Sequence, residues 1–337
     1  MPAKKQNHST FVYNNTVAIS IATLFAVVGI PLLIVLSSQQ ANFFSQAAGS
    51  ALVEAENGTR SGAITEVADV NASGGKYIKL GSLSSLSPTP TAVPGWILRW
   101  QDDISKGLTT FEGTEDDRFN LHPEATHIFA NNGVYRFEMH LNDRDQPDRQ
   151  RQEVYGMRDT SSNVIKMKQG ETWRQVYEVF IPTTHDGTTD FNHINQVKQI
   201  SLLNGRDANT PSSPVATLSL MKGSTSGNET MVMISHYPTP VAFNPIPLGP
   251  LQGKWIEVEN EYKFDFAANG GYMRMAVRSG GTLITDNTKT NVEMWTTEGT
   301  GNDNWMRPKW GIYRAISPTN LQDTYMEMRN MRWYQKQ

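Results

Sequence analysis

Three segments of the 337-residue chain carry polar residues at every second position, so these side chains would share one face of an extended strand. In the first segment, DRQRQEV, the residues on one face are Arg149, Arg151 and Glu153. A guanidinium held by a neighbouring carboxylate is a rigid, permanently charged fork that suits a ligand carboxylate. The alternative is a ladder of ion pairs on an exposed strand. A similar pair, Arg136 and Glu138 in YRFEMH, makes Arg136 a further candidate, so neither Arg/Glu segment is unique in the sequence.

The second segment, HINQVKQ, places Gln196 and Lys198 on one face and His193 and Asn195 on the other. An amide beside an ammonium can hold a carboxylate in its charge-stabilised form. Taken alone, this segment also fits an ordinary half-exposed strand.

The third segment, RPKWGIYR, is the most informative. Lys309, Gly311 and Tyr313 would face one way, and Trp310 and Ile312 the other. The glycine leaves a gap between a lysine and a tyrosine through which a ligand could approach the backbone. A strand with a buried Trp/Ile face and a solvated Lys/Tyr face explains every feature except this glycine.

Many short strands must position these segments. Residues 96–337 show period-two alternation broken by Gly, Pro, Asn and Asp clusters, with hardly any amphipathic helix. The expected strands include residues 134–141, 172–181, 193–203, 231–237, 255–266, 272–277 and 325–334. This pattern predicts an all-β fold, a single jelly-roll sandwich of two packed antiparallel sheets. Aromatic residues in or beside the strands are expected mainly in the core, with one or two on the concave face: Trp100, Trp173, Tyr177, Trp255, Trp295, Trp305, Trp310 and Trp333.

The order R-x-E, then Q-x-K, then K-x-G-x-Y-R, within residues 96–333, resembles the jelly-roll polysaccharide lyases. This concanavalin-like group includes alginate lyases, heparin lyase I and the glucuronan lyases, and RPKWGIYR and DRQRQEV are most similar to the heparin-lyase-like and glucuronan-lyase-like branch. The resemblance implies an enzyme that cleaves an acidic polysaccharide by β-elimination at a uronate residue.

The resemblance also implies roles for individual residues. Removal of the uronate C5 proton requires that the adjacent carboxylate be neutralised, which Arg151, Gln196 and Lys198 would do. Tyr313 would take the C5 proton and protonate the leaving oxygen, with its pKa lowered by Lys309 as a cationic neighbour. A wider set is expected to contact the substrate: Lys198, Arg149, Glu153, His193 and Arg136.

One position departs from the pattern. Alginate lyases of this type have a histidine where this chain has Lys198, so a neutral imidazole base is missing there. His193 is close in sequence, but strict alternation predicts that it faces away. More of the proton transfer would therefore fall to Tyr313.

Two other functions remain open. A sandwich-fold glycoside hydrolase would need two carboxylates across the scissile bond. The alternating Glu257, Glu259 and Glu261 could supply them, although they also fit the solvated face of an outer strand. A non-catalytic carbohydrate-binding domain at the cell surface would use the same groove but would tolerate the loss of Tyr313.

The composition excludes several classes of protein. The chain has no cysteine, which removes thiolate metal sites, a cysteine nucleophile and disulfides. A net charge of −3 and a pI of about 6.2 do not indicate a nucleic-acid partner. We expect a monomer with no cofactor and no metal ligands. Calcium would require oxygen ligands such as Glu115–Asp117, or Asp143 with Asp145, but these lack a defined spacing and are expected in solvated loops.

Residues 17–36 are almost wholly apolar, about the length that crosses a bilayer as a helix. Lys4 and Lys5 precede them with no acidic residue, which favours a cytoplasmic N-terminus (residues 1–16) and an extracytoplasmic domain. A cleaved signal, with a site near Ala47, Ala48 and Ser50, is the alternative. We expect a single-pass protein of the cell membrane.

Residues 37–95 form the expected tether. EAENG and ASGGKYIKLG within it resemble the start of carbohydrate-binding modules of the family 6 and 35 type, but this stretch is too short for such a module and is expected to form a small hairpin or a spacer. SLSSLSPTPTAVPG then predicts an extended linker. The jelly-roll domain would occupy residues 96–337.

Overall fold

The computed structural model describes residues 64–68, 76–80, 94–123, 126–223 and 228–337. The expected membrane span at residues 17–36 and most of the tether lie outside these ranges. None of the helices in the described ranges is long and apolar enough to cross a membrane. The chain divides into two units, Met1–Leu86 and Ser87–Gln337. In the first, β1 (Ile64–Ala68) pairs antiparallel with β2 (Lys76–Leu80), which confirms the expected hairpin.

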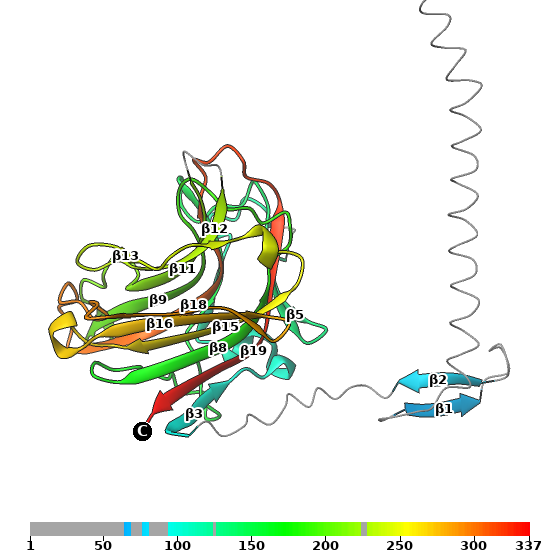
Figure 1. The fold of residues 1–337 in the computed structure, drawn as a ribbon, viewed down its shortest axis with the longest axis horizontal. Helices are drawn as coiled ribbons and strands as arrows, with labels where there is room; N and C mark the ends of the chain where they lie inside the picture. The colour runs from blue at the N-terminus through cyan, green and yellow to red at the C-terminus, as the bar shows by residue number, and fades with distance from the viewer. Residues whose placement is uncertain (1–63, 69–75, 81–93, 124–125, 224–227) are drawn as a thin grey trace, which may run out of the picture. The chain divides into compact units, whose positions relative to one another are not determined.

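The second unit is a sandwich of two antiparallel sheets, the arrangement expected for a jelly roll (Figure 1). The first sheet has the order β13-β12-β11-β9-β18-β7-β4, with β10 beside β9 and β14 beside β12. Its strands are β4 (Gly113–Asp116), β7 (Arg149–Tyr155), β9 (Asn192–Leu203), β10 (Arg206–Asp207), β11 (Ala216–Lys222), β12 (Glu229–Ser235), β13 (Val241–Ala242), β14 (Ile246–Pro247) and β18 (Asp303–Ala315).

The second sheet has the order β17-β16-β15-β8-β19-β6-β5, with β3 beside β19. Its strands are β3 (Trp96–Gln101), β5 (Ile128–Asn131), β6 (Val134–Met139), β8 (Thr172–Phe180), β15 (Trp255–Lys263), β16 (Tyr272–Ser279), β17 (Thr282–Thr290) and β19 (Thr324–Lys336). Three short 3₁₀ turns complete the described part: η2 (Ile104–Thr110), η3 (Gly249–Leu251) and η4 (Ala267–Asn269). All seven strands named from the sequence are confirmed, as β6, β8, β9, β12, β15, β16 and β19.

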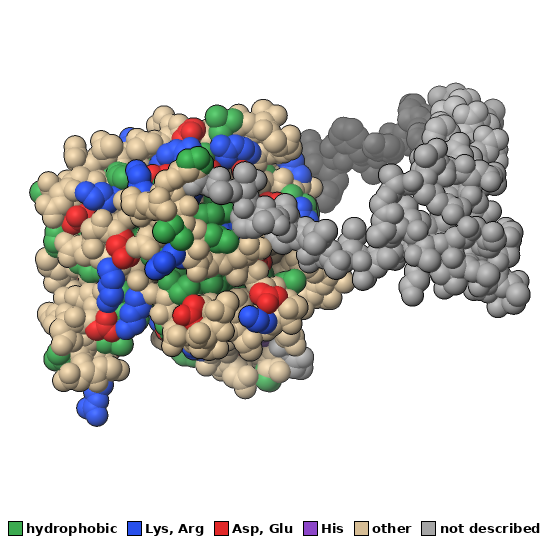
Figure 2. All heavy atoms as spheres, turned by 90° about the horizontal axis from the view of Figure 1, so that it is seen from below, with side chains coloured by type: hydrophobic (Ala, Val, Ile, Leu, Met, Phe, Trp, Pro, Cys, Tyr) green, Lys and Arg blue, Asp and Glu red, His purple; other side chains and the backbone are tan. Residues whose placement is uncertain are grey.

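The core lies between the sheets and is rich in aromatic and methionine side chains. Trp173, Tyr262 and Trp333 are buried together, and Trp333 stacks on Tyr262 with ring centroids 6.2 Å apart. Methionine is flexible enough to fill the gaps that such large rings leave. Seen from below, the molecule shows basic and acidic side chains interspersed rather than a surface of one sign (Figure 2). No broad basic footprint is therefore visible on this face.

Candidate active site

Three neighbouring strands, β7, β18 and β9, bring the three predicted segments together. Tyr313 on β18 lies opposite Arg151 on β7 and His193 on β9, and Lys309 lies opposite Gln196. A groove of about 840 Å³ runs over these strands. Seven of the nine residues that were expected to catalyse the reaction or contact the substrate line it: Arg149, Arg151, His193, Gln196, Lys198, Lys309 and Tyr313.

The packing of β18 explains which of its side chains face the groove. Trp310 and Ile312 are fully buried in the core, and Trp310 stacks on Trp100 with ring centroids 5.8 Å apart. Because successive side chains of a strand point to opposite faces, this burial directs Lys309 and Tyr313 into the groove. The predicted faces of Lys309 and Tyr313, and of Trp310 and Ile312, are confirmed.

The role expected for Gly311 is wrong. Its backbone φ is +131°, and an added Cβ would lie 2.0 Å from the carbonyl oxygen of Gln152 and 2.9 Å from a ring carbon of Phe137. The glycine is required because β7 passes close to β18 at this point, not because a ligand enters between Lys309 and Tyr313.

The expectation that His193 faces away is also wrong. Between His193 and Asn195, β9 spans two residues where β11 advances by only one, from Leu218 to Ser219. Such a bulge shifts the alternation by one position, so His193 and Gln196 line the same groove although they are three residues apart. Period-two counting cannot anticipate this shift.

His193 is held as a neutral imidazole. Burial, followed by the nearby His236 and Arg151, lowers the pKa of His193 to about 3. Its Nδ1 lies 2.8 Å from Ser219 Oγ, which is 3.0 Å from Thr217 Oγ1, and that hydroxyl is 3.0 Å from His236 Nε2. These hydrogen bonds are consistent with a His193 that donates through Nδ1. The lone pair then lies on Nε2, which points away from Ser219.

Tyr313 has a different cationic neighbour from the one expected. Arg149 Nη1 donates a hydrogen bond of 2.6 Å to Tyr313 Oη, and Asp148 holds the other side of this guanidinium through two contacts of 2.7 Å. The hydrogen bond to Asp148 is the main reason that the pKa of Arg149 is raised. Arg151 lies over the Tyr313 ring, 3.9 Å from its centroid, and the rings of His193 and Tyr313 are 5.7 Å apart. Two arginines, rather than Lys309, surround this phenol.

Lys309 belongs to a network of charges at the base of the groove. It is only 2% exposed and pairs with Glu115 and, at 2.9 Å, with Glu153. Arg151 donates to Glu115 at 2.8 Å and lies 3.3 Å from Asp145. Burial raises the pKa of Glu115, but Lys309 and Arg151 outweigh burial and lower it to about 2. Glu115 therefore stays ionised, and together with Glu153 and Asp145 it holds the two cations in fixed positions.

Glu153, which we expected to contact the ligand, is fully buried and does not line the groove. It accepts a hydrogen bond from Gln196 Nε2 as well as the ion pair from Lys309. Its role in the structure is to orient these two side chains from below.

Lys198 differs from the other cations of the groove. In the part of the chain that the structure describes it has no carboxylate partner, and its ammonium donates to the Ser212 carbonyl oxygen at 3.2 Å. Burial, followed by the charges of Lys309 and Arg151, lowers its pKa to about 8. A half-buried cation of this kind is suited to an anionic ligand.

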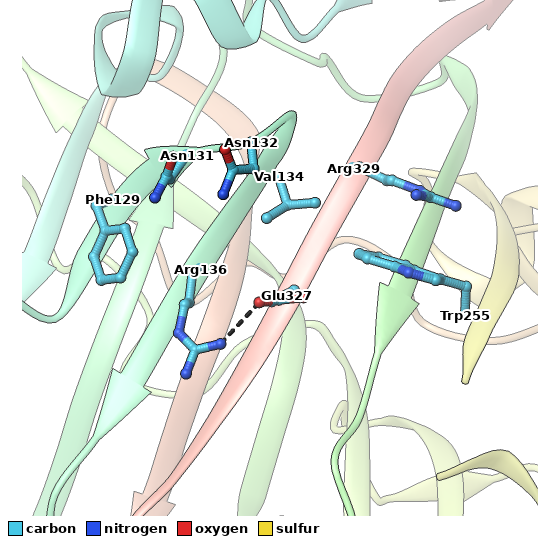
Figure 3. Close-up of a pocket in the computed structure, with 8 residues that line it drawn as sticks. All are labelled: Phe129, Asn131, Asn132, Val134, Arg136, Trp255, Glu327 and Arg329. Atoms are coloured by element: carbon cyan, nitrogen blue, oxygen red, sulfur yellow. Dashed lines mark hydrogen bonds and ion pairs between the residues drawn. The ribbon is translucent and has the colours of Figure 1, made fainter. Parts of the chain in front are cut away.

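Arg136 does not belong to this groove, contrary to the expectation from the sequence. It lies on β6 of the other sheet, where it pairs with Glu138 at 2.7 Å. It also pairs with Glu327 at 2.8 Å (Figure 3). Its guanidinium also covers the Tyr325 ring at 3.7 Å. Figure 3 shows Arg136 beside a separate hollow that Trp255 also lines. The repeated R-x-E pattern therefore marks two different sheets.

The carboxylates considered for a hydrolase also lie on the second sheet, on β15. Glu257 is 3.1 Å from Arg278, and Glu261 is 3.1 Å from Arg174. Glu259 pairs with Arg274. On this partly exposed face of β15 the carboxylates are paired with arginines, and they do not line the groove described above.

The acidic clusters considered for calcium are not solvated loops. Asp117, Asp143 and Asp145 are 5%, 0% and 1% exposed. Asp145 pairs with Arg118 and Arg151, and Asp117 accepts hydrogen bonds from the backbone of His122 and Arg144 at 2.8 Å each. Sequence reasoning missed the position of Glu115, and no local pattern indicates that its partners lie on β7 and β18.

No family model and no curated protein matches the chain. Among solved structures, it is similar to an alginate lyase from a Chlorella virus (11% identity, TM-score 0.43, covering 72% of this chain and 100% of that one). An alginate lyase from Klebsiella pneumoniae has 12% identity and a TM-score of 0.41, with 61% and 83% covered. A family PL-14 alginate lyase from Aplysia kurodai has 13% identity and a TM-score of 0.39, with 59% and 82% covered. These similarities are distant, so the assignment of function depends on the groove itself.

Proposed function

We propose that this protein is a polysaccharide lyase that cleaves a uronate-containing acidic polysaccharide by β-elimination in the groove of β7, β18 and β9. One arrangement carries the proposal. A neutral imidazole, His193, and an arginine-bound phenol, Tyr313, line the same groove as Lys198, which has no carboxylate partner among the described residues. These groups match the three requirements of the reaction, which are a base, an acid and a counter-charge for the uronate carboxylate.

Each group has a defined task in the proposed reaction. Lys198 and Gln196 bind the carboxylate and stabilise the negative charge that develops when the C5–H bond breaks. His193 Nε2 takes the C5 proton, and the electron pair of that bond forms the C4–C5 double bond. The C4–O bond breaks, and Tyr313 donates its proton to the leaving oxygen. Arg149 then stabilises the phenolate that remains.

The hydrogen-bonded chain behind His193 supports its use as the base. Which ring nitrogen of a histidine is free depends on the hydrogen bond that the other one makes. Ser219 engages Nδ1, and Thr217 and His236 continue the chain. With Nδ1 as the donor, Nε2 is the basic nitrogen, and a pKa of about 3 leaves it unprotonated at neutral pH.

The test is to incubate the full chain with glucuronan, alginate and a heparin-like polymer and to measure products. A lyase produces an unsaturated uronate that absorbs in the ultraviolet, together with one new reducing end per cleavage. New reducing ends without ultraviolet absorbance would instead indicate a hydrolase. Binding to a polymer without any product across the panel would favour a carbohydrate-binding domain and would contradict the proposal.

A further inference from the structure

A second group of side chains lies apart from the residues assigned to the elimination. His122, His127, His140 and Asp143, called here the histidine cluster, place one potential ligand atom each within 4.8 Å of one another. His127 lies just before β5 and His140 just after β6, while Asp143 follows in the β6–β7 connection. The cluster therefore joins segments of both sheets at one edge of the sandwich.

The spacing within the cluster is that of metal ligands. Asp143 Oδ1 lies 3.3 Å from His122 Nδ1 and 3.3 Å from His127 Nε2, and Asp143 Oδ2 lies 3.4 Å from His140 Nδ1. Ligands bound tetrahedrally to zinc at about 2.0–2.1 Å are about 3.3–3.4 Å apart. The two separations from Asp143 Oδ1 match this value.

Two of the potential ligand atoms are buried without a hydrogen bond. His127 and Asp143 are 3% and 0% exposed, and in the described structure neither His127 Nε2 nor Asp143 Oδ1 makes a hydrogen bond. A buried polar atom without a partner is unfavourable, and buried polar groups in proteins are nearly always satisfied. Both atoms lie within 4.8 Å of the other potential ligand atoms, and a cation bound among them would satisfy both.

The groups around the cluster orient its ligands. Asp116 Oδ1 lies 2.7 Å from His127 Nδ1, so this ring donates to a carboxylate and turns Nε2 inward. Asp143 Oδ2 accepts hydrogen bonds from the His140 backbone at 2.7 Å and from Gln152 Nε2 at 3.1 Å, which leaves Oδ1 for the centre. Histidine ligands of metals characteristically donate their second nitrogen in this way, and ligating carboxylates are themselves hydrogen-bonded.

We propose that the histidine cluster binds one divalent transition-metal ion of the zinc class. Three imidazoles and one carboxylate suit zinc, whereas calcium and magnesium prefer sets of oxygen ligands. Four protein ligands close the coordination sphere, which is typical of a structural site rather than a catalytic one. The ion would fasten the end of β4 next to Glu115, which pairs with Arg151 and Lys309. The proposal does not depend on the lyase reaction.

The test measures metal binding directly, with the full chain free of any histidine tag and stripped of metal by a chelator. Calorimetry and elemental analysis should show one Zn²⁺ per chain, no comparable uptake of Ca²⁺, and a melting temperature that rises with zinc concentration. Substitution of a residue that hydrogen-bonds to a metal ligand typically weakens metal binding about 10–100-fold. Asp116→Asn should fall within this range. His140→Gln removes a ligand and should weaken zinc binding more.

His140 is a suitable position because its side chain is partly exposed, so the metal-free variant should still fold, which circular dichroism would verify. His236→Gln is the matched control, because His236 lies outside the cluster, and this variant should bind zinc like the parent. The proposal is overturned if the stripped protein takes up no zinc, or if His140→Gln and His236→Gln bind it equally well.

Discussion

Tyr313 receives a hydrogen bond of 2.6 Å from Arg149, and the proposed reaction makes this phenol the acid. Tyr313→Phe keeps the ring under Arg151 but removes the transferable proton. We expect kcat to fall by about 10²–10⁴-fold, the usual contribution of a positioned acid or base, while polymer affinity stays nearly unchanged. Tyr325→Phe, on the other sheet, is the control and should keep full activity. Equal turnover by Tyr313→Phe and the parent would exclude the proposed mechanism.

Substitution of His193 distinguishes a mechanism in which His193 and Tyr313 each transfer one proton from a mechanism in which Tyr313 transfers both. His193→Gln should lower kcat by about 100-fold or more if the imidazole is the base. Because its folded-state pKa is about 3, protonation of His193 should not reduce kcat/KM between pH 7 and pH 5 in the parent. A variant that keeps its kcat would return both proton transfers to Tyr313.

Lys198 should control the alkaline side of substrate binding. Its pKa is lowered to about 8, so the free protein loses this positive charge as the pH rises through that value. We expect kcat/KM for an anionic polymer to fall above about pH 8. In Lys198→Arg this decline should disappear, since arginine stays charged, and in Lys198→Met affinity should be low at every pH. If Lys198→Arg shows the same decline of kcat/KM with pH as the parent, the decline belongs to another group.

At the scale of the element, β18 depends on Gly311. An alanine would combine a φ of +131° with a Cβ 2.0 Å from the backbone of β7. We expect Gly311→Ala to lower the free energy of unfolding by about 3 kcal/mol or more, measured by urea denaturation. Gly280→Ala, with a φ of +55° but open space, separates strain from collision and should cost about 1 kcal/mol. Similar losses in both variants would show that β7 yields to the added methyl group.

At the scale of the whole molecule, we propose that the N-terminal segment anchors the sandwich to a membrane on its extracytoplasmic side. The apolar residues 17–36 and the preceding Lys4 and Lys5 motivate this proposal. The full chain, expressed in cells, should sediment with membranes, resist extraction by high salt and dissolve in detergent. Protease added outside intact cells should cleave the sandwich from its anchor. Recovery of the uncleaved chain in the salt-extracted fraction would contradict the anchor.

The sequence by itself determined the strands, the two-sheet class and the outward face of β18, because burial of alternate side chains is a local pattern that survives in one dimension. It also named seven of the residues that line the groove. Only the tertiary structure decided which of them meet. The β9 bulge turned His193 into the groove, and β6 joined the other sheet and placed Arg136 there. Glu115 on β4 reached Lys309 on β18 across β7. Strand order, bulges and the partners of buried charges arise from contacts between distant segments, and periodicity along the chain does not encode them.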